Sequence, residues 1–286
     1  MDIAVLGMGR MGRALAGRLL DSEHNITIWN RSPGKAPELL DRGAREARSI
    51  AEALDGVELV VTSLANDDAV DEVALGDGGV KSALPADATY VDASTVAPGT
   101  TGALGRAFSR YVAMPILGSP PQVASGEAIY LIGAENGNGD AVGPLFPHLS
   151  EKQFRYERPA MAAAAKLTVN LMLLNGVVAL SEAFADGRAG GLSDDQLREL
   201  LGNSPMVAPG LKYRFEGILT GQQEPFWTTR LGAKDARLAV ELAEAAGVDL
   251  PLTGTARRMY EQAATRSDSA DIASVAELYR QPDRNH

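Results

Sequence analysis

A short apolar run followed at once by a glycine pattern, at the start of the chain, most constrains what this sequence can fold into. Ile3–Leu6 is typical of a β-strand, and the residues that follow it directly are Gly7, Met8, Gly9, Arg10, Met11 and Gly12. In the pattern Gly-x-Gly-x-x-Gly, the first glycine allows a tight turn and the second lets the backbone approach a pyrophosphate. The third lets helix and strand pack closely. A helical pattern over Met11–Leu20 and a β-like run over Ile26–Trp29 complete a βαβ unit. The six residues therefore predict a dinucleotide site, with the pyrophosphate at the helix N-terminus, rather than a glycine-rich turn that binds nothing.

The first half of the chain continues to alternate β-like runs with amphipathic stretches such as Ile50–Leu54. Further β-like runs are Leu59–Ser63, Tyr90–Asp92, Tyr111–Ala113 and Ile129–Ile132. This alternation predicts a mostly parallel sheet. After about residue 158 only helical patterns follow, over Pro159–Ala185, Asp194–Leu201, Leu231–Ala246 and Thr253–Ala264. We predict an α/β domain of the Rossmann type, with a doubly wound sheet, over residues 1–158, and an all-α domain over residues 159–286.

The end of the second predicted strand indicates which dinucleotide is preferred. An NAD site usually has an acidic residue there to hold the ribose 2′-hydroxyl, but this chain has Asn30, Arg31 and Ser32. The guanidinium of Arg31 can stack on adenine or pair with a 2′-phosphate, and Ser32 adds a hydroxyl. Lys35 is more simply explained as a solvated surface residue. The sequence therefore favours NADP(H) over NAD(H).

A second glycine-rich segment, Gly133–Asp140, also follows a β-like run. Its spacing differs from the dinucleotide pattern, and Glu135 and Asp140 would repel a pyrophosphate. We predict a surface turn here.

Composition excludes several classes of function. The formal charge of −10 disfavours nucleic-acid binding, which needs a basic surface. The chain has no cysteine, and its three histidines are scattered, so we expect neither disulfides nor a metal site. No signal-like segment precedes Ile3–Leu6, and the uncharged stretch Leu167–Ser181 is shorter than the roughly 20 residues of a membrane span. We expect a soluble, cytoplasmic protein that does not bind membranes.

Lys166 and Asn170 lie four residues apart in the long helical pattern and so share a face. A lysine in an apolar run is costly to bury unless its ammonium reaches a cleft or a partner. Desolvation favours the neutral amine, which suits proton transfer near neutral pH. A snorkelling surface lysine is the simpler alternative.

Taken together, these motifs resemble the β-hydroxyacid dehydrogenase family, which includes 3-hydroxyisobutyrate dehydrogenases, glyoxylate and succinic-semialdehyde reductases and, more distantly, imine reductases. The resemblance spans almost the whole chain. The segments that carry it are Gly7–Gly12, Asn30–Ser32, Thr62–Asp67, Asp92–Pro98, Lys166 with Asn170, and Phe226 with Leu231–Asp235.

The resemblance implies a role for each matching residue. Lys166 would exchange a proton with the substrate oxygen while NADPH supplies a hydride, and Asn170 would help fix the substrate. Further cofactor contacts are implied for Leu64, Ala65, Asn66, Thr95 and Lys234, and substrate contacts for Ser94, Thr95, Leu117 and Gly118. For Ser94 and Thr95 ordinary turn hydrogen bonding remains an alternative, as does a surface Lys–Asp pair for Lys234. A homodimer is also implied.

One segment departs from the family pattern. The substrate motif usually reads acidic-Ala-Pro-Val-Ser-Gly, but here Met114 lacks the preceding acid and Leu117 replaces the serine. The substrate would therefore meet a more apolar surface, which puts a small carboxylate substrate in doubt.

Three functions remain open. The leading prediction is NADPH-dependent reduction of a small aldehyde, ketone or oxo acid. Reduction of a cyclic imine is the second and draws on Leu117 and Met114, although imine reductases usually lack the lysine at position 166. The third is a non-catalytic NADPH-binding sensor, which Lys166 argues against. A nucleic-acid reader is disfavoured by the charge.

Overall fold

The computed structural model describes residues 1–22, 24–150 and 152–280. The chain divides into two compact units, Met1–Lys166 and Leu167–His286. The division falls inside one long helix, α9 (Pro159–Ala189), which begins directly after the predicted domain boundary at residue 158.

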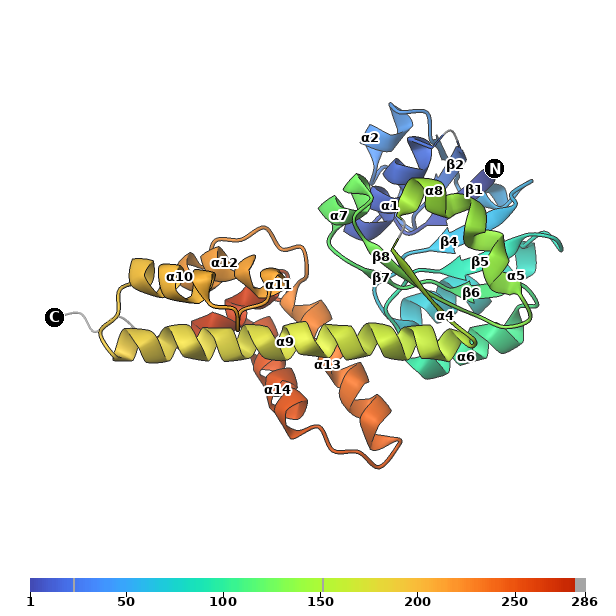
Figure 1. Ribbon diagram of the computed structural model, residues 1–286. Coiled ribbons are helices and arrows are strands. Elements are labelled where there is room, and N and C mark those ends of the chain that lie inside the picture. The colour runs from blue at the N-terminus through green and yellow to red at the C-terminus, as the bar shows by residue number, and fades with distance from the viewer. Residues whose placement is uncertain (23, 151, 281–286) are drawn as a thin grey trace. The chain divides into compact units, whose positions relative to one another are not determined.

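The first unit is built on a single sheet with the strand order β3-β2-β1-β4-β5-β6-β8-β7, and β9 pairs with β8 (Figure 1). The strands are β1 (Asp2–Leu6), β2 (Asn25–Trp29), β3 (Arg45–Glu46), β4 (Leu59–Thr62), β5 (Thr89–Asp92), β6 (Tyr111–Ala113), β7 (Ile116–Leu117), β8 (Ile129–Ala134) and β9 (Gln153–Tyr156). The pairs from β3 through β6 are parallel, whereas β8 runs antiparallel to β6 and β7. The order reverses between β1 and β4, and ligands of such sheets bind beyond the carboxyl ends of the strands at this switch point.

Helices cover both faces of this sheet. They are α1 (Arg10–Leu20), α2 (Pro37–Leu40), α3 (Ile50–Ala53), α4 (Asp67–Leu75), α5 (Val80–Ala83), α6 (Pro98–Ala107), α7 (Pro120–Ser125), the 3₁₀ helix η1 (Asn138–Leu145) and α8 (Phe146–Leu149). Because successive side chains of a strand point to opposite faces, Ile3 and Val5 of β1 join a core with α1, α2, α7 and α8. Ala4 and Leu6 join a second core with α3, α4, α5 and α6. The predicted doubly wound α/β domain is confirmed.

The second unit is helical throughout its described part, and the only β-type pairing there is the isolated bridge between Thr228 and Asp271. Besides α9, its helices are α10 (Asp194–Asn203), α11 (Pro209–Lys212), α12 (Phe215–Thr220), α13 (Thr229–Glu244), α14 (Pro251–Arg266) and the 3₁₀ helix η2 (Ile272–Leu278). The helices α13 and α14 pack together, and Leu174 and Val177 of α9 share a core with Tyr260 of α14. The predicted all-α region is confirmed.

Among the described residues, α9 is the one helix long and apolar enough to cross a bilayer by length and composition alone. This helix extends beyond both ends of the uncharged stretch Leu167–Ser181, which by itself is shorter than a membrane span. Of the residues in its most apolar window, 44% are buried within the protein. Core helices of soluble proteins have the same length and composition. Its polar side chains also have protein partners: Lys166 bonds to the backbone of β7, and Asn170 bonds to α13.

Differences from the predicted elements concern short segments. The strands β3, β7 and β9, of two to four residues, were not predicted. The segment Gly133–Asp140 is only partly the predicted surface turn. Its first two residues end β8, the turn has Gly137 at φ +78°, and η1 begins at Asn138.

Candidate functional site

The protein's own backbone requires the first and third glycines of the loop between β1 and α1. Gly7 has φ +101°, and a Cβ there would lie 2.4 Å from Ser63 O. A Cβ on Gly12 would lie 1.9 Å from Gly7 O. These two glycines allow the chain to turn sharply and α1 to lie against β1.

The second glycine has a different role. Gly9 has φ −71°, which any residue adopts, and a Cβ there would meet no atom within 4 Å. Packing of the protein therefore does not explain a glycine at this position. The open space beside Gly9 fits the close approach of a ligand to the backbone.

Gly9 is the N-cap residue of α1, and no side chain among the described residues caps this helix end. The first turn of α1 contains no acidic residue. The N–H groups of a first turn have no partners within their helix and carry the positive end of its dipole. An anion such as a pyrophosphate fits this position, at the switch point of the sheet.

Asn30 ties the glycine loop to the end of β2. Met8 N donates to Asn30 Oδ1 at 3.0 Å, and Asn30 Nδ2 donates to Ser32 O at 2.8 Å. Met8 takes part through its backbone, because its side chain is buried in the core. Arg10 and Ser32 are exposed, and Met11 is half-buried.

Arg31 extends into solvent, with 82% of its side chain exposed. Its Nη1 lies 3.6 Å from Oε2 of Glu72, which is itself 65% exposed. An exposed ion pair of this kind is worth roughly 0–1 kcal/mol, so a phosphate can compete for Arg31. Sequence reasoning missed Glu72, because α4 brings it to the end of β2 from a distant part of the chain.

Asp92, at the end of β5, joins two loops predicted to contact ligands. Thr62 Oγ1 donates to Asp92 Oδ1 at 2.8 Å, and Ser94 N donates to the same oxygen at 3.1 Å. Ser94 Oγ in turn accepts from Leu64 N at 2.9 Å. Burial raises the pKa of Asp92, although the hydrogen bonds from Ser94 and Thr62 oppose this shift. Ser94 therefore forms the hydrogen bonds of a structural residue within the loop. Its neighbour Thr95 is half-buried.

The loop after β4 is fixed at a second point. Asp67 Oδ1 accepts from Ala97 N at 2.8 Å and from Thr100 Oγ1 at 2.6 Å. Asn66 caps α4 by accepting from Ala69 N at 3.0 Å, and Ala65 beside it is exposed. The loops after β4 and β5 are thus hydrogen-bonded to each other, and they lie near the glycine loop, since Gly7 approaches Ser63.

Lys166 is buried, with 9% of its surface exposed, and is not a snorkelling surface residue. Its Nζ donates to Ile116 O at 2.6 Å. Ile116 and half-buried Leu117 form β7, and exposed Gly118 follows. The first unit therefore brings the predicted catalytic ammonium to the backbone of the predicted substrate segment. Met114, in contrast, is completely buried in the core.

The second unit brings Asn170 and Lys234 together through a residue to which we gave no role. Asn170 Nδ2 donates to Asp235 Oδ2 at 2.8 Å, and Lys234 Nζ lies 2.9 Å from Asp235 Oδ1. Lys234 and Asp235 do form the pair that we considered, but the pair is not at the surface, because the two side chains are only 12% and 4% exposed. On α9, Asn170 lies one turn after Lys166.

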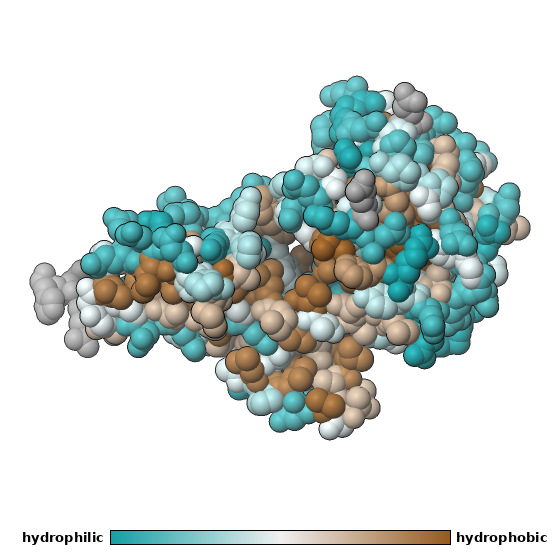
Figure 2. Space-filling view, viewed as in Figure 1, coloured by the Kyte–Doolittle hydropathy of each residue, from teal (hydrophilic) through white to brown (hydrophobic). Residues whose placement is uncertain are grey.

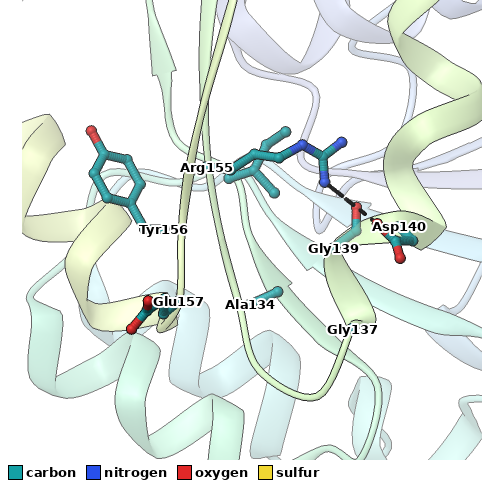
Figure 3. Close-up of a pocket in the computed structure, with 8 residues that line it drawn as sticks. Ala134, Gly137, Gly139, Asp140, Arg155, Tyr156 and Glu157 are labelled. Atoms are coloured by element: carbon teal, nitrogen blue, oxygen red, sulfur yellow. Dashed lines mark hydrogen bonds and ion pairs between the residues drawn. The ribbon is translucent and has the colours of Figure 1, made fainter.

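A pocket of about 270 Å³ lies elsewhere in the first unit, between β8, β9 and η1 (Figure 3). Arg155 Nη1 donates to Gly139 O at 3.1 Å and lies 3.8 Å from Asp140 Oδ1. The pocket includes Gly137 and Gly139 of the second glycine segment, and Glu157 adds another carboxylate. None of the predicted site residues lines it.

The strand order, with an uncapped, glycine-lined helix start at its switch point, is that of a dinucleotide-binding domain. Residues 2–157 match the family model described as the NAD binding domain of 6-phosphogluconate dehydrogenase. Residues 160–279 match the model described as NAD-binding of NADP-dependent 3-hydroxyisobutyrate dehydrogenase. The chain belongs to the β-hydroxyacid dehydrogenase family, whose members use a nicotinamide cofactor.

Individual relatives agree with this assignment. The chain is 30% identical to the uncharacterized oxidoreductase YfjR of Bacillus subtilis over 91% of its own length and 93% of that protein. It is 28% identical to glyoxylate/succinic semialdehyde reductase 1 of Arabidopsis thaliana, over 98% and 99% of the two chains. A crystal structure of 3-hydroxyisobutyrate dehydrogenase from Salmonella typhimurium has the same fold. Its TM-score is 0.88 at 20% identity, with 96% of this chain and 99% of that chain covered.

Proposed function

We propose that this protein is an NADPH-dependent reductase of the carbonyl group of a small aldehyde, ketone or oxo acid. The observation that carries the proposal is the buried Lys166, whose ammonium bonds to the backbone of Ile116 directly before Leu117 and Gly118. The name of the Arabidopsis relative, a glyoxylate and succinic semialdehyde reductase, supports a small carbonyl substrate.

Lys166 would move the proton in this reaction. The hydrogen bond to Ile116 O orients the ammonium and offsets part of the cost of burying it. An ammonium has three donors, and in the proposed reaction one of them would bond the carbonyl oxygen of the substrate. The glycine loop and the start of α1 would hold NADPH, which would supply the hydride to the carbonyl carbon. Lys166 donates its proton to the oxygen, and in the reverse direction its neutral amine accepts the hydroxyl proton.

The residues at the end of β2 support a preference for NADPH over NADH. No acidic residue of β2 or of Asn30–Ser32 is present to hold a 2′-hydroxyl, and Arg31 is exposed there. A guanidinium forms charge-assisted bonds with a phosphate. The glycine loop and the start of α1 would hold the pyrophosphate, and cofactor contacts are proposed for Thr95 and for Lys234.

Half-buried Leu117 keeps reduction of a cyclic imine as the second candidate, because an apolar side chain stands where a carboxylate-binding hydroxyl would. Buried Met114 gives this candidate no direct support. A non-catalytic NADPH sensor is the third candidate, and it leaves the contact of Lys166 unexplained.

We further propose a cytoplasmic homodimer that binds neither nucleic acid nor membranes. Apolar side chains reach the surface of the helical unit (Figure 2), among them Val169 and Met172 of α9, which are 46% and 70% exposed. A second copy of the chain that covered this surface would explain why these apolar side chains are exposed in the single chain. Analytical ultracentrifugation of the full chain tests the dimer, and a monomer at micromolar concentration would contradict it.

The first experiment follows NADPH oxidation with glyoxylate, succinic semialdehyde, simple ketones and cyclic imines, and uses NADH for comparison. Wild type is run beside Lys166→Ala and, as a matched control, Lys152→Ala, which removes an exposed lysine. We expect turnover of a carbonyl that falls roughly 10²–10⁴-fold in Lys166→Ala and persists in Lys152→Ala. Turnover of imines alone would favour the second candidate, and NADPH binding without turnover would favour the sensor.

A further inference from the structure

Asp235 is a buried carboxylate at the centre of the polar contacts in the second unit. It lies on α13 and is 3% exposed. One of its oxygens accepts from Asn170, which is 6% exposed, and the other pairs with Lys234. A buried charge is tolerated when it is paired and hydrogen-bonded. Lys234 supplies the ion pair and Asn170 the hydrogen bond, whereas Oδ1 itself accepts no hydrogen bond within the described part of the chain.

Close packing of α13 on α9 places Asp235 there. A Cβ on Gly232 would lie 2.8 Å from Cγ2 of Ile272 in η2 and 3.2 Å from Cδ2 of Leu174 in α9, so a larger residue would be crowded against both side chains. Residues three or four apart share a helix face. Asp235 therefore lies on the same face as Gly232, and Asn170 on the same face as Leu174. Gly232 and Leu174 thus lie in contact on the two helix faces that carry Asp235 and Asn170.

This contact fixes the orientation of the Asn170 amide. An ionised carboxylate has acceptors only, whereas an amide has donors on nitrogen and acceptors on oxygen. Asn170 must therefore turn Nδ2 toward Asp235, and its Oδ1 points away from this partner. Lys234 Nζ lies 2.9 Å from the other oxygen, Asp235 Oδ1, and so helps to hold the carboxylate in this arrangement.

We infer that Asp235 is a positioning residue, which presents Asn170 Oδ1 as a hydrogen-bond acceptor to the reacting groups. Asn170 then accepts a hydrogen bond from an ammonium or from the hydroxyl of an alcohol product, instead of donating to a carbonyl through an unconstrained amide. This inference rests on the proposed function. It gives Asp235 an effect on turnover that acts through Asn170.

The test uses the full chain with NADPH and the best carbonyl substrate from the panel. The variants are Asp235→Asn, which has the same shape but can offer either a donor or an acceptor, Asn170→Ala, and the two combined. Asp271→Asn is the matched control, because it removes another buried carboxylate from an ion pair in the same unit, with Arg214. NADPH titration gives the number of binding-competent sites, and kcat is expressed per such site.

We expect kcat per site to fall in Asp235→Asn on the order of 100-fold, and to stay near wild type in Asp271→Asn while its Tm falls. The double variant should be no slower than Asn170→Ala, because one residue acts through the other. In an NMR spectrum, the Asn170 side-chain amide protons should shift upfield when Asp235 becomes Asn.

Independent, multiplicative losses in the double variant would overturn the inference, as would unchanged kcat per site in Asp235→Asn with an active wild type. If Asp235→Asn does not fold, Asn170→Ala decides: wild-type kcat in that variant would overturn the inference. A wild type that binds NADPH but reduces no carbonyl overturns the proposed function itself, and this outcome differs from all the others.

Discussion

Alanine at Gly9 and alanine at Gly12 should have opposite effects, although both add one methyl group to the same loop. A Cβ at Gly12 would lie 1.9 Å from Gly7 O, whereas a Cβ at Gly9 would meet no protein atom within 4 Å. An ordinary contact between carbon and a carbonyl oxygen is about 3.3 Å. In Gly12→Ala, α1 would therefore have to move from the turn after β1 by roughly 1.4 Å, the difference between these distances.

The magnitudes follow from these distances. Over-packing costs about 1–3 kcal/mol, and the upper end applies to Gly12→Ala because the nearest atom belongs to the backbone. A loss of about 3 kcal/mol lowers the Tm by roughly 6–12 °C in a protein of this size. Gly9→Ala should leave the Tm unchanged. It should weaken NADPH binding on the order of 100-fold, because the methyl group displaces about two charge-assisted bonds of roughly 1.5 kcal/mol each.

Circular dichroism without cofactor gives the Tm, and a fluorescence titration gives the Kd for NADPH. Wild-type affinity in Gly9→Ala would refute the placement of the pyrophosphate beside Gly9. A wild-type Tm in Gly12→Ala would refute the packing argument.

Three further predictions concern Arg31, Asp92 and Leu117. Arg31→Ala should weaken NADPH binding about 10–100-fold, the value of one charge-assisted bond, and leave NADH binding unchanged. Equal losses for the two cofactors would contradict a contact with the 2′-phosphate, and Glu72→Gln is the control for the ion pair. Since burial raises the pKa of Asp92, the folded state binds that proton more tightly than the unfolded chain, so the free energy of unfolding falls as pH rises from about 4 through the raised pKa. Asp92→Asn should lack this decline in urea unfolding at a series of pH values, and an identical pH dependence would exclude Asp92 as its source. Leu117→Ser should raise kcat/KM for glyoxylate relative to a simple ketone, because it adds a hydroxyl for a carboxylate, and an unchanged ratio would show that Leu117 does not contact the substrate.

Contiguous patterns were sufficient to predict the architecture. The first βαβ unit follows from one glycine pattern between two apolar runs, and α13 and α14 follow from their periodicity. The missed strands β3, β7 and β9 are short, and they become strands because they pair with β2 or β8. No local pattern in a segment of two to four residues announces such a partner.

Contacts within the candidate site depend even more on residues that are distant in the sequence. The glycines, Arg31 and Lys166 were predicted because their type and spacing carry the signal. The bond from Asn170 to Asp235 joins residues 65 apart in the sequence, and that from Thr62 to Asp92 joins residues 30 apart. From the sequence, an aspartate after a lysine on an amphipathic helix is expected to form a solvated pair, but tertiary packing of α13 buries this one.

The uncapped start of α1 links folding to the nucleotide pool. A helix that begins with a capping side chain gains about 1 kcal/mol, and this chain leaves that position open beside Gly9. A bound dinucleotide would take the place of the missing cap, so it stabilises only the folded form. By mass action this adds about 2.7 kcal/mol to the stability when the free nucleotide is 100 times its Kd. The fraction of this protein that survives heat or proteolysis in a cell should therefore rise and fall with the concentration of its cofactor.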